Sequence, residues 1–195
     1  MAPILPAHRP RNPAPHPPSR HRLRDPGTAL VLVDLQHWTV ERPSAPLTGA
    51  AVVRSAARLK TAFEAAGHPV VLVRYARTDG SDGGPDAAMN RFAPEVDARP
   101  GNEVVTKYGI DAFDGTDLAD RLRRLGATAL VLAGITTEYG VGESARTAVA
   151  LGYPTTVVED AVTALSAPAH TAALRALRDL GATVTSTDAL LTARN

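Results

Sequence analysis

The residues that decide the fold run from 128 to 146 and read "TALVLAGITTEYGVGESAR". The apolar run at 128–134 is typical of a strand buried on both faces of a parallel sheet. A turn follows, and then a helix that we expect to reach about residue 151. In open α/β sheets, such strand-to-helix turns carry functional side chains. This turn, however, contains no histidine, no cysteine and no obvious nucleophile.

Strands and helices alternate along the chain from residue 27. We expect the other strands at 28–34, 69–75, 102–107, 154–160 and 182–187. The other helices are expected at about 50–66, 116–125 and 168–180, and a short terminal helix follows the last strand. A glycine follows each of these three helices, as is typical of helix C-termini: Gly67, Gly126 and Gly181. The alternation predicts an α/β fold, with a doubly wound, six-stranded, mostly parallel sheet and helices on both faces.

The composition is that of an ordinary globular domain. Of the 195 residues, 44% are hydrophobic and 21% are charged, and the net charge is +1. We therefore expect no nucleic-acid partner. No membrane is expected either, since no apolar run approaches the roughly 18 residues of a transmembrane helix. The chain has no cysteine, which excludes disulfides, thiolate metal sites and cysteine nucleophiles. A cytoplasmic location is the expectation.

Two segments depart from the alternating pattern. Residues 1–26 hold 8 of the 16 prolines and are rich in arginine and histidine, which predicts an extended N-terminal arm separate from the domain at 27–195. The alternatives for this arm are a bridge between subunits or an anion contact. Residues 76–101 form a long loop rich in glycine, aspartate and proline, for which we expect a role as a lid or as a subunit contact.

Charged residues end two of the predicted strands. Asp34 follows the first apolar run, and Lys107 ends the third strand. An aspartate in this position is a candidate general acid or base, and a nearby lysine would keep it ionised or stabilise a developing negative charge. The alternatives are an Asx turn or helix cap for Asp34 and a solvated strand end for Lys107.

Three motifs occur in order along the chain: "VDLQ" at 33–36, "TKYGIDAFDGTDL" at 106–118 and "GITTEYGVGESARTAVALGYPTTVVEDA" at 134–161. Together they resemble the isochorismatase-like hydrolase family, and the resemblance covers residues 27 to 190. It implies a six-stranded parallel sheet with the active site at the strand ends, commonly between subunits. A homodimer or homotetramer acting on a small-molecule substrate is therefore expected.

The resemblance also implies site residues. Family members usually employ an aspartate, a lysine and a cysteine; Asp34 and Lys107 match the first two, and the cysteine position falls on Gly140. The peptide before Thr136 is typically cis in the family and helps to form an oxyanion-binding pocket with N–H groups near Gly140. We assign substrate contacts to Gln36, Trp38, Ile135, Thr136 and Tyr139.

Two kinds of chemistry occur in the family. Its amidases attack a carbonyl with the cysteine thiolate, a route that Gly140 closes here; the nearby hydroxyls of Ser144, Thr137 and Tyr139 are the possible substitutes. True isochorismatases also have glycine at this position and hydrolyse a vinyl ether. In them the aspartate, held protonated, gives a proton to the enol carbon before water adds. Overall, the chain is most similar to a Gly-type subgroup whose members often have no assigned substrate.

Several neighbouring residues allow more than one interpretation. His37 could be a proton shuttle or a surface residue, and Gly109 stands where true isochorismatases usually have an arginine. The segment "RYARTDG" at 74–80 lacks the histidines that bind metal in nicotinamidases of this fold, so neither a catalytic metal nor a cofactor is expected. We predict an ion pair between Glu138 and Arg146.

The function predicted from these residues is hydrolysis of a small cyclic molecule by acid–base chemistry of Asp34 and Lys107, without a cysteine nucleophile. Vinyl-ether hydrolysis is the best precedent, and secondary metabolism is the expected context. One alternative is a non-catalytic or regulatory member that binds a small molecule. The other is an amidase-type C–N hydrolase that uses another nucleophile or water.

Overall fold

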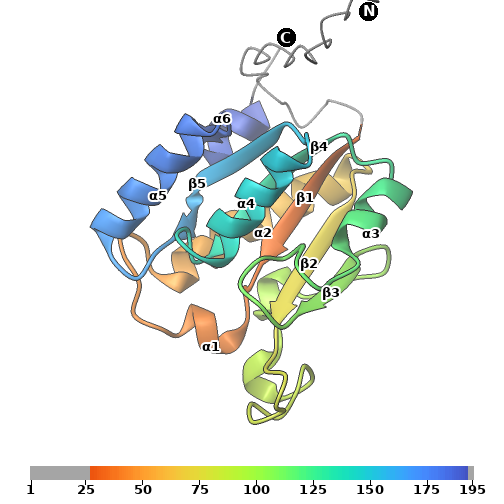
Figure 1. Ribbon diagram of the computed structural model, residues 1–195, viewed down its shortest axis with the longest axis vertical. Helices are drawn as coiled ribbons and strands as arrows, with labels where there is room; N and C mark the ends of the chain where they lie inside the picture. Colours follow the sequence, from red (N-terminus) through yellow and green to blue (C-terminus); the bar gives the residue numbers. More distant parts are fainter. Residues whose placement is uncertain (1–26, 193–195) are drawn as a thin grey trace, which may run out of the picture.

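The fold is a six-stranded sheet in which every neighbouring pair of strands is parallel (Figure 1). The computed structural model describes residues 27–192, so the predicted arm at 1–26 lies outside the described residues. The strand order is β3-β2-β1-β4-β5-β6. The bounds are β1 (Thr28–Val33), β2 (Val70–Tyr75), β3 (Glu103–Lys107), β4 (Ala129–Ile135), β5 (Thr155–Thr163) and β6 (Thr183–Thr185). The predicted doubly wound α/β sheet is confirmed.

Helices cover both faces of the sheet. Apolar side chains of α3 (Leu118–Arg124), α4 (Gly140–Ala150) and α5 (Ala167–Asp179) pack in one core cluster. The other cluster contains side chains of α2 (Gly49–Ala65) and α6 (Thr187–Thr192). The shorter helices are α1 (His37–Val40), η1 (Ala88–Asn90) and η2 (Pro94–Val96). Among the helices of residues 27–192, none has the length and hydropathy of a transmembrane segment.

Local sequence signals set the ends of the long helices. The hydroxyl of Thr48 accepts a hydrogen bond from the Ala51 N–H at the start of α2, and Ser166 does the same for Ala169 at the start of α5. These bonds satisfy N–H groups that have no partner inside the helix. The three glycines predicted to end helices all have positive φ: Gly67, Gly126 and Gly181.

The strand order reverses between β1 and β4, because β2 and β3 extend the sheet on one side and β5 and β6 on the other. Gly134 makes the close approach of these two strands possible. Its φ is 136°, and a Cβ atom there would lie 2.0 Å from the carbonyl oxygen of Val33. Ligands of open α/β sheets bind at such reversal points, outside the carboxyl ends of the strands.

The structure differs from the prediction most in β5, which continues to Thr163. Its pairing with β4 shifts register between Leu132 and Gly134, so the strand contains a bulge that periodicity did not reveal. Asp160 lies in this irregular part. Its Oδ1 accepts hydrogen bonds from the N–H and the hydroxyl of Thr187, the first residue of α6.

Candidate active site

Asp34 follows β1 at the carboxyl edge of the sheet. Its φ is 55°, in the left-handed region that non-glycine residues rarely adopt. The backbone is held on both sides of the residue: the Asp34 N–H donates to the Val73 carbonyl at 2.8 Å, and the Asp34 carbonyl accepts from the Thr39 hydroxyl. Strained backbone of this kind costs about 1–3 kcal/mol and is concentrated at functional sites.

Lys107, the last residue of β3, reaches the Asp34 carboxyl across the end of β2. Its Nζ lies 2.8 Å from Asp34 Oδ2, and both side chains are at least nine-tenths buried. The ammonium also donates to the carbonyls of Gly109 at 3.1 Å and Ile110 at 3.0 Å. The structure therefore brings together the two charged strand ends found in the sequence, and the three acceptors use all three ammonium protons.

Burial is the largest influence on the pKa of the Asp34 carboxyl. Desolvation raises the pKa of its carboxyl from 3.8 to about 6, and the charge and hydrogen bond of Lys107 limit this rise. Oδ2 accepts from Lys107, whereas Oδ1 is buried and has no hydrogen-bond partner among the described residues. A proton on Asp34 therefore belongs on Oδ1.

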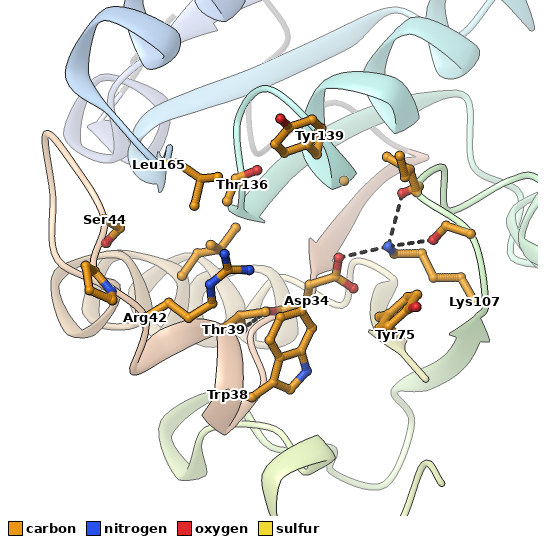
Figure 2. Close-up of a pocket in the computed structure, with 15 residues that line it drawn as sticks. Asp34, Trp38, Thr39, Arg42, Ser44, Tyr75, Lys107, Thr136, Tyr139 and Leu165 are labelled. Atoms are coloured by element: carbon orange, nitrogen blue, oxygen red, sulfur yellow. Dashed lines mark hydrogen bonds and ion pairs between the residues drawn. The ribbon is translucent and has the colours of Figure 1, made fainter. Parts of the chain in front are cut away.

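A cavity of about 330 Å³ lies beside this pair. Figure 2 shows the side chains that surround it. Its charged lining residues are Asp34, Lys107 and Arg42, and its large apolar ones are Trp38, Tyr75, Ile110, Ile135, Tyr139 and Leu165. Tyr75 and Trp38 meet edge to face, with ring centres 6.0 Å apart. A mostly apolar cavity with a few converging polar groups is typical of a small-molecule site.

Gly140, the first residue of α4, faces the charged pair. A Cβ atom at this position would lie 2.8 Å from Asp34 Oδ2 and 3.7 Å from Lys107 Nζ. The carboxylate therefore occupies space next to α4 that a side chain at 140 would need. The peptide between Ile135 and Thr136 is cis, as the resemblance implied.

Proteins with similar sequences and folds identify the family of the chain. The family model for the isochorismatase domain matches residues 28–189. The chain belongs to the isochorismatase family. It is 34% identical over 181 residues to the uncharacterized family protein YecD of Escherichia coli O157:H7, covering 85% of this chain and 95% of that protein. A solved isochorismatase family structure from Burkholderia thailandensis has 36% identity and a TM-score of 0.78, covering 84% of this chain and 93% of that one.

Other similar proteins are hydrolases by name, and one of them is an amidase. The N-carbamoylsarcosine amidase of Thermoplasma acidophilum superposes with a TM-score of 0.71 at 28% identity, covering 83% of this chain and 96% of that one. A streptothricin hydrolase of Streptomyces noursei is 32% identical over 147 residues, which are 74% of this chain and 57% of that protein. The family thus consists of hydrolases and includes amidases.

Four of the five residues assigned to substrate contacts line the cavity: Trp38, Ile135, Thr136 and Tyr139. Gln36 does not line it. Its side chain is fully buried, donates to the carbonyls of Tyr75 and Asn90, and accepts from the Tyr75 N–H. Gln36 therefore ties the segment after β1 to the end of β2 and to loop 76–101.

Two of the three hydroxyls considered near Gly140, those of Ser144 and Thr137, have structural partners. Ser144 is fully buried; it donates to the Gly140 carbonyl at 2.6 Å and accepts from the Ala112 N–H at 2.9 Å. Thr137 is also fully buried and lies 3.0 Å from Nδ1 of His170 on α5, a histidine that sequence spacing did not indicate. Neither hydroxyl lines the cavity, so neither is placed to attack a substrate there.

One further expectation fails, and the structure bears on two of the open alternatives. Arg146 pairs with Glu143 at 3.5 Å, while Glu138 accepts a hydrogen bond from the Leu165 N–H, so the predicted ion pair between Glu138 and Arg146 is absent. Loop 76–101 does not line the cavity, and neither does His37; Phe92 and Val96 instead anchor the loop in the core. A role of this loop as a subunit contact stays a prediction.

Sequence reasoning missed Arg42, Ser44 and Leu165, which also line the cavity. They lie in the connections after α1 and after β5, where neither a motif nor a periodic pattern marks them. Within residues 27–192, no group of three histidine, aspartate or glutamate side chains is arranged to hold a metal ion.

Proposed function

We propose that the chain is a thiol-independent hydrolase of the Gly-type subgroup, with Asp34 as general acid and base and Lys107 as its electrostatic partner. One observation carries the proposal. The Asp34 carboxyl lines an apolar cavity with its pKa raised to about 6, and Gly140 offers no nucleophile beside it. A general acid works best when its pKa lies near the working pH. The favoured reaction is hydrolysis of a vinyl ether on a small cyclic substrate.

In this reaction Asp34 transfers its proton to the terminal carbon of the vinyl group, and the C=C electrons form the new C–H bond. The adjacent carbon becomes oxocarbenium-like and takes up water, whose released proton returns to Asp34. The hydroxyl proton of the resulting hemiketal passes to the ring oxygen as the C–O bond between them breaks, which gives a ketone and the ring alcohol. Once Asp34 has lost its proton, Lys107 at 2.8 Å compensates the carboxylate charge.

The test is a mass-spectrometric turnover assay of the wild-type chain beside Asp34→Asn and Asp114→Asn. The panel holds isochorismate, chorismate-type enol ethers, nicotinamide and simple cyclic amides. We expect release of pyruvate from an enol ether by the wild type and by Asp114→Asn, whose substitution changes an exposed carboxyl. Asp34→Asn should lose it. Full turnover by Asp34→Asn would overturn the proposal.

The N-carbamoylsarcosine amidase among the similar structures favours a second candidate, C–N hydrolysis with a water activated by Asp34. This reaction requires Asp34 as a base, so its rate should increase as the pH rises through about 6. The rate of the acid-catalysed vinyl-ether reaction should decrease over the same range. Release of ammonia from an amide would support it. Ligand binding without turnover of any substrate would favour a regulatory binding protein.

A further inference from the structure

A substrate anion would find Lys107 already occupied. Its three ammonium protons are directed to Asp34 Oδ2, the Gly109 carbonyl and the Ile110 carbonyl, at 2.8, 3.1 and 3.0 Å. Its side chain is only 3% exposed. Lys107 therefore serves the protonation of Asp34 and has no donor left for a negatively charged group of a ligand.

Arg42 is the other cation of the cavity, and it is differently placed. It is exposed, and no carboxylate or carbonyl pairs with it in the part of the chain that the structure describes. Its Cζ lies 5.9 Å from the centre of the Trp38 ring, over the ring face. Figure 2 shows its guanidinium directed into the cavity, towards the side where Thr136 and Asp34 lie. Its planar set of N–H donors suits a carboxylate.

Two more observations point to a ligand with a polar group on this side. Thr136 lines the same cavity, and its hydroxyl oxygen is buried and has no hydrogen-bond partner among residues 27–192. Buried polar atoms of native proteins are almost always paired, so an unpaired one in a residue of the cavity wall favours a missing polar partner on this side. The charges agree: Asp34 and Lys107 cancel when both are ionised, which leaves the charge of Arg42 uncompensated.

We infer that the cavity takes a small cyclic carboxylate, whose carboxylate binds Arg42 while its apolar ring lies against Trp38. This inference rests on the proposed function and adds to it the residue that holds the substrate carboxylate. The reacting bond then lies towards Asp34, at the other end of the molecule. A cavity of about 330 Å³ suits a ligand of this size. Arg42 is a specificity-determining residue in this arrangement, because it distinguishes an acid from its neutral analogue.

Matched acid and amide pairs test the inference without any knowledge of the true substrate. Benzoate and benzamide, cyclohexanecarboxylate and its amide, and nicotinate and nicotinamide are titrated into the wild-type chain. Trp38 is the single tryptophan and lies under Arg42, so its fluorescence reports binding. We expect at least one carboxylate to bind about 10- to 100-fold more tightly than its amide.

Substitutions identify the residue that causes the preference for the acid over its amide. Arg42→Gln should abolish the preference for the acid, and Arg42→Lys should keep part of it, since the charge remains but the planar donor pair is lost. Arg54→Gln removes the same charge from an exposed position of α2 outside the cavity and should change nothing. The inference is overturned if acids and amides bind equally, if Arg42→Gln keeps the preference, or if no carboxylate binds.

Asp34→Asn separates this inference from the proposed function. The variant should lose turnover but keep the preference for carboxylates, because the Arg42 side chain is unchanged. Carboxylate binding in a wild-type chain that turns over no substrate would refute the hydrolase and leave the Arg42 site standing. Turnover that depends on Asp34 but does not change with Arg42→Gln would support the hydrolase and refute the role of Arg42.

Discussion

Replacing Asp34 with asparagine should change how the stability of the protein depends on pH. The substitution preserves the shape of the side chain but removes its titration. Burial raises the pKa of the wild-type carboxyl to about 6 in the folded state, against an ordinary value of 3.8 for an accessible one. The folded state therefore binds more protons than the unfolded state between these two values, and unfolding releases them.

The sign and size of the effect follow from these values. A proton held more tightly by the folded state stabilises it below pH 3.8, and that stabilisation is lost as the pH rises through about 6. The difference between the two pKa values corresponds to about 3 kcal/mol of unfolding free energy. Relative to Asp34→Asn, the wild type should thus lose about 3 kcal/mol between acid and neutral pH. The substitution also alters the contact with Lys107, which shifts the unfolding free energy of the variant by a similar amount at every pH. The pH-dependent difference between the wild type and the variant therefore remains.

Urea unfolding, followed by Trp38 fluorescence at several pH values from about 4.5 to 7.5, measures the difference. Part of the titration lies below this window, so about two thirds of the full change should be seen within it. Asp114→Asn is the control, because it changes an exposed carboxyl and should run parallel to the wild type. If the unfolding free energy of the wild type minus that of Asp34→Asn stays constant or increases as the pH rises, the protonated acid on which the mechanism depends is refuted.

Three other substitutions test the site. Lys107→Met should lower the unfolding free energy by about 3–5 kcal/mol at neutral pH, because Asp34 stays buried without its cation; the loss should shrink at pH 5 in the same urea titrations. Gly140→Ala would put a Cβ atom 2.8 Å from Asp34 Oδ2, so it should lower the unfolding free energy by about 1–3 kcal/mol. It should also shift the titration of the Asp34 carboxyl measured by carbon-13 NMR, and an unchanged titration would contradict the expected crowding. Ser144→Ala should cost about 1–3 kcal/mol because the buried Ala112 N–H loses its acceptor, yet leave turnover unchanged; lost turnover at normal stability would make Ser144 a nucleophile after all.

The parts of the site that lie at strand ends could be predicted from the sequence. Asp34 and Lys107 follow apolar runs, and parallel strands bring their carboxyl ends to one edge of a sheet. Their contact at 2.8 Å is therefore the expected outcome of the topology. Gln36 shows the limit of such reasoning, since a residue adjacent to the site in sequence turned its amide towards the backbone of Tyr75 and Asn90.

By itself, the sequence determined the strand and helix order, the parallel sheet, the family motifs and the absence of a thiol. These depend on periodicity and residue type within short stretches of chain, which local physics constrains strongly. Only the tertiary structure decided that Arg42 and Leu165 share a cavity with Asp34, that Ser144 is occupied by backbone partners, and that burial raises the pKa of Asp34. Those properties depend on which distant segments pack together and exclude water, and no local pattern encodes that packing.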